Sequence, residues 1–184
     1  MGRIRTPIPV KLFFGMLSSD PSLFDACTEI IVQEFGPIDY QSDILPWSNT
    51  EYYREEMGPD IARKFIFIEP LHDPSILPDS KIFTNRLENR LAVQTGTVLR
   101  RRINLDPGYI TEAKVILASA KDFAHRIYIG DGIYAEVTLR YSTIHRCFTT
   151  LDHTYPDYGT EAYRTLFNKA RNRLRASLNR TSRK

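Results

Sequence analysis

The sequence predicts an α+β fold made of ferredoxin-like βαββα units, in which an antiparallel or mixed sheet carries its helices on one face. Two observations support this fold class. Apolar runs bounded by turn residues alternate with longer segments whose apolar residues recur at helical spacing. These segments follow the order βαββα in the first half of the chain. The second half begins with a strand, adds further strands and ends with a helix.

A single domain is expected over residues 1–184, because a chain of this length can bury one core. The order of elements raises the idea of two pseudo-repeated halves, 8–97 and 98–178, followed by a basic tail, 179–184. No residue-level repeat connects the halves, so this idea depends on element order alone.

The first half is predicted to open with a strand and a helix. Val10–Leu17 is an apolar run that ends in turn residues, which is typical of a buried strand. Asp20 can cap the helix that follows, Pro21 suits its first position, and a Gly-Pro pair ends it after Phe35. Ile38–Leu45 is predicted to form the second strand.

The rest of the first half adds a short helix, a strand and a long helix. Ser48–Glu51 fits a capping box and predicts the short helix. Ala62–Glu69 alternates weakly in hydrophobicity and is read as a strand. The long helix is expected over 79–93, with Gly96 at its end.

The second half is predicted to be mainly strands. Arg102–Leu105 has the composition of a strand, and Asp106-Pro107-Gly108 is a turn signal. Thr111–Lys114 fits a helix start, although Val115–Leu117 fits a buried strand equally well. Both alternatives stay open.

A hairpin and a final helix complete the chain. Ala124–Ile129 and Ile133–Tyr141 are predicted to pair, Ile144–Thr149 fits a further strand, and a helix is expected over 160–178. One face of that helix gathers apolar residues expected to dock on the protein, namely Tyr163, Phe167, Ala170 and Leu174.

The register of the hairpin follows from matching its two faces. A two-residue loop would place Ile127 beside Glu136, whereas a three-residue loop, Gly130–Gly132, places similar residues opposite each other. The three-residue loop is therefore expected. Its pairs are Ile129 with Ile133, Tyr128 with Tyr134, Ile127 with Ala135 and Arg126 with Glu136.

Composition and cysteine content favour a soluble cytoplasmic protein. Hydrophobic residues make up 42% and charged residues 26% of the chain, and no apolar run approaches the roughly 20 residues of a membrane span. Two cysteines cannot form a disulfide framework, and Cys27 falls on the apolar face of a predicted helix. The four histidines are scattered, so no metal site is expected.

Two nucleotide-binding patterns are present only in part. Gly130-x-Gly132-x-x-Ala135 fits a dinucleotide fingerprint, but strand-like sequence on both sides favours a hairpin turn. Ser119–Lys121 is similar to the guanine-contacting string of GTPases, yet the chain has no Gly-x-x-x-x-Gly-Lys-[Ser/Thr] loop to hold phosphates. Neither pattern supports a nucleotide-binding class.

Several unusual strings occur in order along the chain and together resemble a known family. They are Asn104–Tyr109, Leu117–Asp122, His125–Tyr128, Gly132–Leu139 and Thr154–Tyr158, with a looser match at Lys81 and Thr84-Asn85-x-x-Glu88. The chain resembles the bacterial domain of unknown function family numbered 4416 over nearly its whole length. His153 stands where the family leads us to expect Trp. The resemblance implies no substrate.

Polar residues of the second half form one candidate site. Lys121 and Arg126 are expected to hold an anionic ligand, while Glu136 or Asp106 orients or deprotonates it. The remaining candidate ligand-binding residues are Tyr109, Lys114, Asp122, His125, Tyr134, Asp157 and Tyr158. Alternation points His125 towards the apolar face. A scaffold of cross-strand ion pairs and loop hydrogen bonds is an equally good interpretation.

The preferred function is binding of a small anionic metabolite or nucleotide in a polar cleft of the second half, with catalysis and any cofactor left open. The alternative is a module that binds RNA or a ribonucleoprotein, because residues 160–184 hold eight basic residues and one acidic residue. Arg171 and Arg175, one helical turn apart, are its candidate contacts and are expected to be exposed. A solvated helix face and a purely structural partner protein are the other interpretations.

Overall fold

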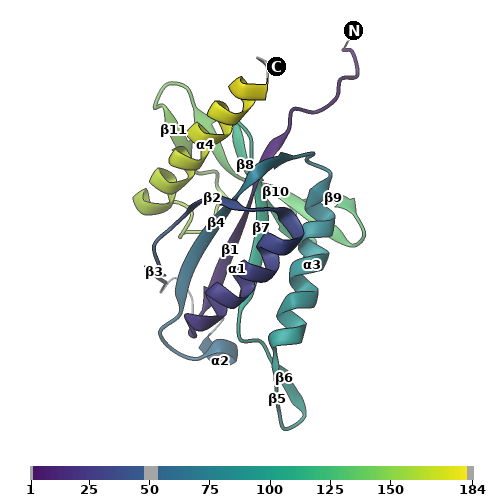
Figure 1. Ribbon diagram of the computed structural model, residues 1–184, viewed down its shortest axis with the longest axis vertical. Coiled ribbons are helices and arrows are strands. Elements are labelled where there is room, and N and C mark those ends of the chain that lie inside the picture. Colours follow the sequence, from purple (N-terminus) through teal and green to yellow (C-terminus); the bar gives the residue numbers. More distant parts are fainter. Residues whose placement is uncertain (1, 48–53, 182–184) are drawn as a thin grey trace.

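The computed structural model describes residues 2–47 and 54–181 of the chain (Figure 1). Its strands are β1 (Val10–Ser18), β2 (Ile38–Gln41), β3 (Leu45–Pro46), β4 (Ala62–His72), β5 (Val93–Thr95), β6 (Val98–Arg100), β7 (Asn104–Ile110), β8 (Lys114–Ser119), β9 (Ile127–Gly130), β10 (Ile133–Ser142) and β11 (Cys147–Thr149). Its helices are α1 (Ser22–Phe35), α2 (Arg54–Met57), α3 (Ile76–Leu91) and α4 (Glu161–Thr181).

One antiparallel sheet organises the fold. Within the described residues it has nine strands, and its main path is β11-β10-β8-β7-β1-β4-β2, with β3 beside β4 and β9 beside β10. β5 and β6 form a separate hairpin. The predicted α+β class and the antiparallel sheet are confirmed. None of the helices in the described part of the chain has the length and apolarity that a membrane span requires.

The first strand and helix agree closely with prediction. β1 is buried along its whole length and extends to Ser18. At the start of α1, Asp20 accepts a hydrogen bond from the backbone N–H of Ser22 at 3.1 Å. At its end Gly36 adopts a φ of +102°, a conformation that glycine reaches without steric cost. The local turn chemistry therefore sets both ends of α1.

The later part of the first half differs in its boundaries. Ile38–Leu45 forms two short strands, β2 and β3, that both pair with β4. Ser48–Glu51 lies outside the described residues. α3 begins at Ile76, ahead of the expected start, after Asp73 accepts the N–H of Ser75 at 2.9 Å. Gly96 does not end α3 but lies, with φ +62°, between β5 and β6.

The triplet Asp106-Pro107-Gly108, for which the sequence predicts a turn, lies within β7. Pro107 pairs with Phe14 of β1. It directly precedes Gly108, the first residue of β7 that pairs with β8. A proline is tolerated there because one side of the strand has no neighbour that needs its N–H. A Cβ on Gly108 would lie 2.3 Å from the carbonyl oxygen of Ile116. The turn prediction is therefore wrong. Pro107 lies at the open edge of β7, and Gly108 lies where β7 closely approaches β8.

The hairpin of β9 and β10 has two of the four predicted cross-strand pairs and a different loop. Its loop has two residues, Asp131 and Gly132, with φ of +52° and +76°, and Ile133 pairs with Gly130. A register shift next to Ile133 then restores two predicted pairs, Tyr128 with Tyr134 and Ile127 with Ala135. The three-residue loop is wrong, whereas the matching of faces is confirmed.

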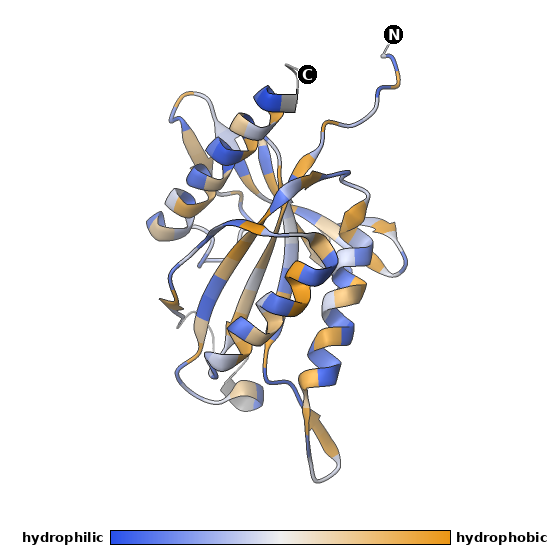
Figure 2. Ribbon diagram, viewed as in Figure 1, coloured by the Kyte–Doolittle hydropathy of each residue, from blue (hydrophilic) through white to orange (hydrophobic). Residues whose placement is uncertain are grey.

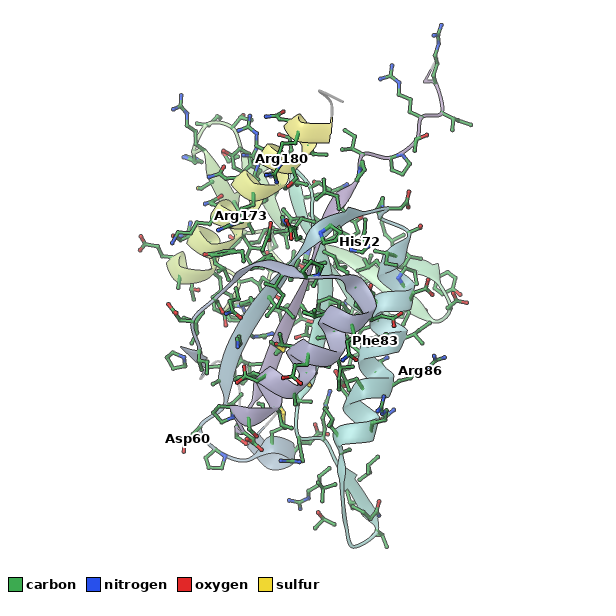
Figure 3. The ribbon with its side chains drawn as sticks, viewed as in Figure 1. Asp60, His72, Phe83, Arg86, Arg173 and Arg180 are labelled. Atoms are coloured by element: carbon green, nitrogen blue, oxygen red, sulfur yellow. The ribbon has the colours of Figure 1, made fainter. Side chains whose placement is uncertain are left out.

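Helices cover both faces of the sheet, in contrast to the single face that was expected. Leu12 and Phe14 of β1 belong to one apolar cluster with α1 and α3, whereas Phe13 belongs to another with α4. Phe13 and Phe167 of α4 have ring centroids 5.1 Å apart. Phe83 lies where α3 faces α1 (Figure 3). The predicted docking face of α4 is confirmed, because Tyr163, Phe167, Ala170 and Leu174 are all buried, and hydrophobic residues alternate with hydrophilic ones along this helix (Figure 2).

The sheet parts between β7 and β8, and this parting positions the candidate site. The two strands pair only from Gly108 to Ile110, so the first part of β7 has β1 on one side and no strand on the other. Side chains of α3 take the place of the missing strand. Glu88 accepts the N–H of Leu105 at 2.7 Å, and Lys81 donates to its carbonyl oxygen at 2.8 Å. Two buried charged residues therefore satisfy the backbone of one strand residue.

Candidate functional site

A cavity of about 390 Å³ opens where β7 and β8 part. Its volume lies in the range typical of small-molecule sites. Its walls come from α3, from β4, β7, β8 and β10, and from the segments that follow β3, β6, β8 and β11. The polar and aromatic residues that line it are Trp47, Arg63, Lys81, Asn85, Glu88, Arg101, Asn104, Asp106, Ser119, Lys121, Phe123, Arg126, Glu136, Tyr155, Asp157 and Tyr158.

Arg63 of β4 joins the two aspartates of the cavity. Its guanidinium donates to Asp106 at 3.1 Å and to Asp157 at 3.2 Å. Trp47 also donates its indole N–H to Asp157 at 3.1 Å. Burial alone would raise the pKa of Asp106, but the charges of Arg63 and Lys81 hold it below its ordinary value. The Asp106 carboxylate is therefore ionised at neutral pH.

α3 brings a lysine and a glutamate to the same cavity. Lys81 is 7% and Glu88 8% exposed, which is unusual for both residue types. Burial raises the pKa of the Glu88 carboxyl above its ordinary value, against the opposing effects of Lys81, the Leu105 amide and Arg101. The ammonium of Lys81 has three N–H donors, and the one acceptor it contacts in the described part of the chain is the Leu105 carbonyl.

Arg126 is held on all sides by protein groups. It donates to Glu136 at 2.8 Å, to the Ser119 hydroxyl at 2.7 Å, to the Lys121 carbonyl at 2.9 Å and to the Tyr155 hydroxyl at 2.6 Å. Glu136 is only 3% exposed and accepts a further bond from Thr138. Most of the donors of Arg126 are thus used within the protein, so this ion pair fixes the wall of the cavity.

Three buried polar atoms on the lining residues lack a hydrogen-bond partner in the described part of the chain. They are Nε of Arg63, Nδ2 of Asn104 and the hydroxyl of Tyr158. Buried polar groups are nearly always satisfied by protein or bound solvent, so such a cluster calls for an acceptor that the protein does not supply. All three atoms can donate a hydrogen bond.

The predicted site residues fall into two groups. Six of them line the cavity together, namely Asp106, Lys121, Arg126, Glu136, Asp157 and Tyr158. The other five lie outside its lining, namely Tyr109, Lys114, Asp122, His125 and Tyr134. Lys114 is exposed and pairs with Arg140 across the strands β8 and β10. The ring centroids of Tyr134 and Tyr128 are 5.5 Å apart. The expected convergence of Lys121, Arg126 and Glu136 on one concave surface is present.

His125 does not take the expected orientation towards the apolar face. Its Nε2 lies 3.1 Å from a carboxylate oxygen of Glu136. Its ring stacks on His153 with centroids 4.5 Å apart. The alternation argument fails because β9 begins only at Ile127, so His125 precedes the strand. His153, which stands in place of an expected tryptophan, still supplies an aromatic contact.

Sequence reasoning gave no site role to the residues that the first half contributes, among them Trp47, Arg63, Lys81 and Glu88. One signal was available. Lys81, Asn85 and Glu88 follow the spacing i, i+4, i+7 and so share one face of a helix. All three line the cavity. Arg63 and Trp47 carry no comparable local signal.

The described residues contain no group of three or more His, Cys, Asp or Glu side chains that could hold a metal ion. Cys27 lies on the buried face of α1, and burial raises the pKa of its thiol to about 12, so it is not a reactive thiolate.

A comparison with protein-family models matches residues 8–174 to the domain of unknown function DUF4416. The match covers most of the chain, so the protein belongs to this family, as the strings in its sequence indicated. No curated protein and no solved structure matches the chain.

Proposed function

We propose that this member of the DUF4416 family binds a small anionic molecule in the cavity between β7, β8 and α3. The observation that carries the proposal is Lys81, a buried ammonium on the cavity wall that contacts a single acceptor in the described part of the chain. Glu88 and Asp106 interact electrostatically with Lys81, but the hydrogen bond of its ammonium in the described part of the chain goes to the Leu105 carbonyl, so an anionic group that accepts from its remaining donors would stabilise it.

The other unpartnered donors support an acceptor-rich ligand. Asn104, the first residue of β7, is 4% exposed, and Tyr158 is 2% exposed beside Arg63. Both can donate to the oxygens of a carboxylate or phosphate. The sequence-based roles change accordingly: Lys81 becomes the principal cation, Arg126 positions the wall, and Lys121 lies at the exposed rim.

The cavity also carries groups suited to proton transfer. The pKa of Asp106 is lowered and that of Glu88 is raised, so the first favours the base form and the second is more readily protonated. Pairs of carboxyl groups with opposite shifts are a frequent source of acid–base catalysis. We propose Asp106 as the candidate base. Glu136 is already bonded to Arg126 and Thr138 and lies beside His125, so a supporting role suits it better.

A neutral substitution at Lys81 tests the proposal. Lys81→Gln keeps a donor for Leu105 but removes the charge, and it should weaken binding of an anionic ligand about tenfold or more. The ligand is found by native mass spectrometry of freshly purified protein and by thermal-shift screening of phosphorylated and carboxylated metabolites. Affinity is then measured by calorimetry.

Lys114→Gln is the matched control, because Lys114 is an exposed lysine on β8 that does not line the cavity. It should leave the affinity unchanged. Equal weakening by both variants, or a screen of folded protein that finds no ligand, would overturn the proposal.

The architecture also supports a ferredoxin-like assignment for part of the chain. The strands β1, β2, β4 and β7 lie in the order β7-β1-β4-β2, all neighbours are antiparallel, and α1 and α3 pack in one apolar cluster on one face. We propose that this portion is the ferredoxin-like unit and that β8 to β11 with α4 extend it. The idea of pseudo-repeated halves gains no such support, since α4 packs on the opposite face.

Nucleic-acid binding by α4 is the alternative proposal. Arg173 and Arg180 lie on α4 (Figure 3), and Arg173, Arg175 and Arg180 are exposed. Arg171, however, is half-buried, with its guanidinium 3.5 Å from the centre of the Tyr141 ring, and Arg175 pairs with Glu112 at 2.9 Å. These internal contacts favour the solvated helix face. Salt-dependent binding of RNA or DNA at low salt would restore the alternative.

A further inference from the structure

We infer that the ligand of this cavity is a two-part molecule, in which an anionic group is joined to a planar aromatic ring. The anionic group occupies the buried polar floor, and the ring lies at the mouth against Phe123 and Tyr155. The inference rests on the proposed anion binding and adds the class of molecule that carries the anion.

The lining of the cavity changes character from the floor to the mouth. The floor donors are almost fully buried, with Lys81 7%, Asn104 4% and Tyr158 2% exposed. Phe123 and Tyr155, in contrast, are 49% and 43% exposed although they line the same cavity. A ligand that matches this gradient is polar at one end and aromatic at the other.

Arg126 fixes both rings at the mouth. Its guanidinium lies 4.5 Å from the centre of the Phe123 ring and donates to the Tyr155 hydroxyl at 2.6 Å. Its bonds to Glu136, Ser119 and the Lys121 carbonyl prevent it from moving with either ring. The two aromatic side chains are therefore ordered before a ligand arrives, which lowers the entropic cost of stacking on them.

Exposed aromatic rings on a concave surface are better explained by a ligand than by packing. Among the other exposed apolar side chains of the described chain, Ile4 and Ile144 lie singly and need no explanation, whereas Val93, Val98 and Leu99 gather on the β5–β6 hairpin, outside the cavity. Phe123 and Tyr155 instead share a cavity of about 390 Å³ with a buried ammonium. Stacking of a planar base on an aromatic side chain is a principal source of affinity in proteins that bind single-stranded nucleic acids.

The anionic group can be a phosphate or a carboxylate, and paired probes separate the two sources. Adenosine monophosphate is compared with ribose 5-phosphate, which lacks the ring, and with adenosine, which lacks the anion. Phenylpyruvate is compared with pyruvate. Calorimetry on the full-length protein gives each affinity. In at least one series the ring-bearing anion should bind about tenfold or more tightly than its ringless partner, and adenosine should bind weakly.

Phe123→Ala provides the decisive variant. It should remove the advantage of the ring, about tenfold, and leave the affinity of the ringless anion unchanged. Ile127→Ala is the control, because Ile127 is 74% exposed, close in sequence and absent from the cavity lining. Circular dichroism confirms that both variants are folded.

The outcomes separate this inference from the proposed function. Ringless anions that bind as tightly as ring-bearing ones, with loss on Lys81→Gln, would overturn the aromatic part and leave anion binding intact. A Phe123→Ala variant that weakens both members of a pair equally would also overturn it. Failure of every probe to bind would overturn the two-part assignment, whereas the proposed function is judged by the broader metabolite screen.

Discussion

α1 and α3 contribute to the same apolar cluster, yet they are held to the sheet by different chemistry. α1 docks through apolar side chains such as Phe24, Cys27 and Ile31, each fully buried. α3 docks partly through Leu87 and partly through Lys81 and Glu88, whose charges are buried as well. Where the sheet is continuous, the strands satisfy one another and the helix needs only hydrophobic contact. Where it parts, the helix must supply polar groups, and a cavity results.

The largest loss of stability is expected from a substitution in α1, the helix that docks through apolar side chains alone. Phe24→Ala removes a fully buried ring from the cluster and should lower the free energy of unfolding by about 3–5 kcal/mol. Urea denaturation measures the change. Because Phe24 does not line the cavity, ligand affinity of the folded variant should match that of the wild type. A loss below about 1 kcal/mol would show that α1 is not docked as described.

Substitution of Glu88 is expected to give an intermediate effect on the free energy of unfolding, whose size depends on the residue that replaces it. Glu88→Leu leaves the Leu105 N–H without its acceptor and should cost about 1–3 kcal/mol, whereas Glu88→Gln keeps an acceptor oxygen. Because the pKa of Glu88 is raised in the folded protein, its contribution to stability is complete below the ordinary value of 4.5. That contribution is lost as pH rises through the folded pKa.

The stability of Glu88→Gln relative to the wild type should therefore increase from acidic to neutral pH. Urea titrations of both proteins across that range measure the difference. A difference that stays constant with pH would contradict the raised pKa, and equal stability of the Leu and Gln variants would contradict the role of Glu88 at the strand edge.

The smallest effect is expected on the surface of α4. Arg175 and Glu112 form an ion pair at 2.9 Å, but their side chains are 54% and 51% exposed. Solvent screening limits the energy that such exposed pairs contribute, so Arg175→Ala should lower the free energy of unfolding by about 1 kcal/mol at most. The change should shrink further in high salt. A larger loss would indicate that α4 contributes to the fold through its charges as well as its apolar face.

The elements that could be predicted from sequence are those governed by local patterns. β1, α1 and the docking face of α4 follow from apolar runs, caps and helical spacing. The start of β7 agrees with the strand predicted over Arg102–Leu105, but the rest of β7 could not be predicted, because Pro107 and Gly108 signal a turn unless the missing strand beside them is known. The same holds for the site: Asp106 and Arg126 stood out as polar residues among strands. Lys81 and Glu88, in contrast, resemble the solvent side of an amphipathic helix until α3 is placed beside the strand edge.

The open edge of β7 also affects how the protein exchanges its amide hydrogens with water. In most of the sheet an amide is released only when neighbouring strands separate, which requires large-scale opening. The Leu105 amide is held by the carboxylate of one side chain. Rotation of Glu88 alone frees it, so this position can exchange through a local motion while the sheet stays intact. The floor of the cavity is thereby one part of the core whose protection depends on a side chain, and ligand binding in the cavity should slow exchange of the Leu105 amide.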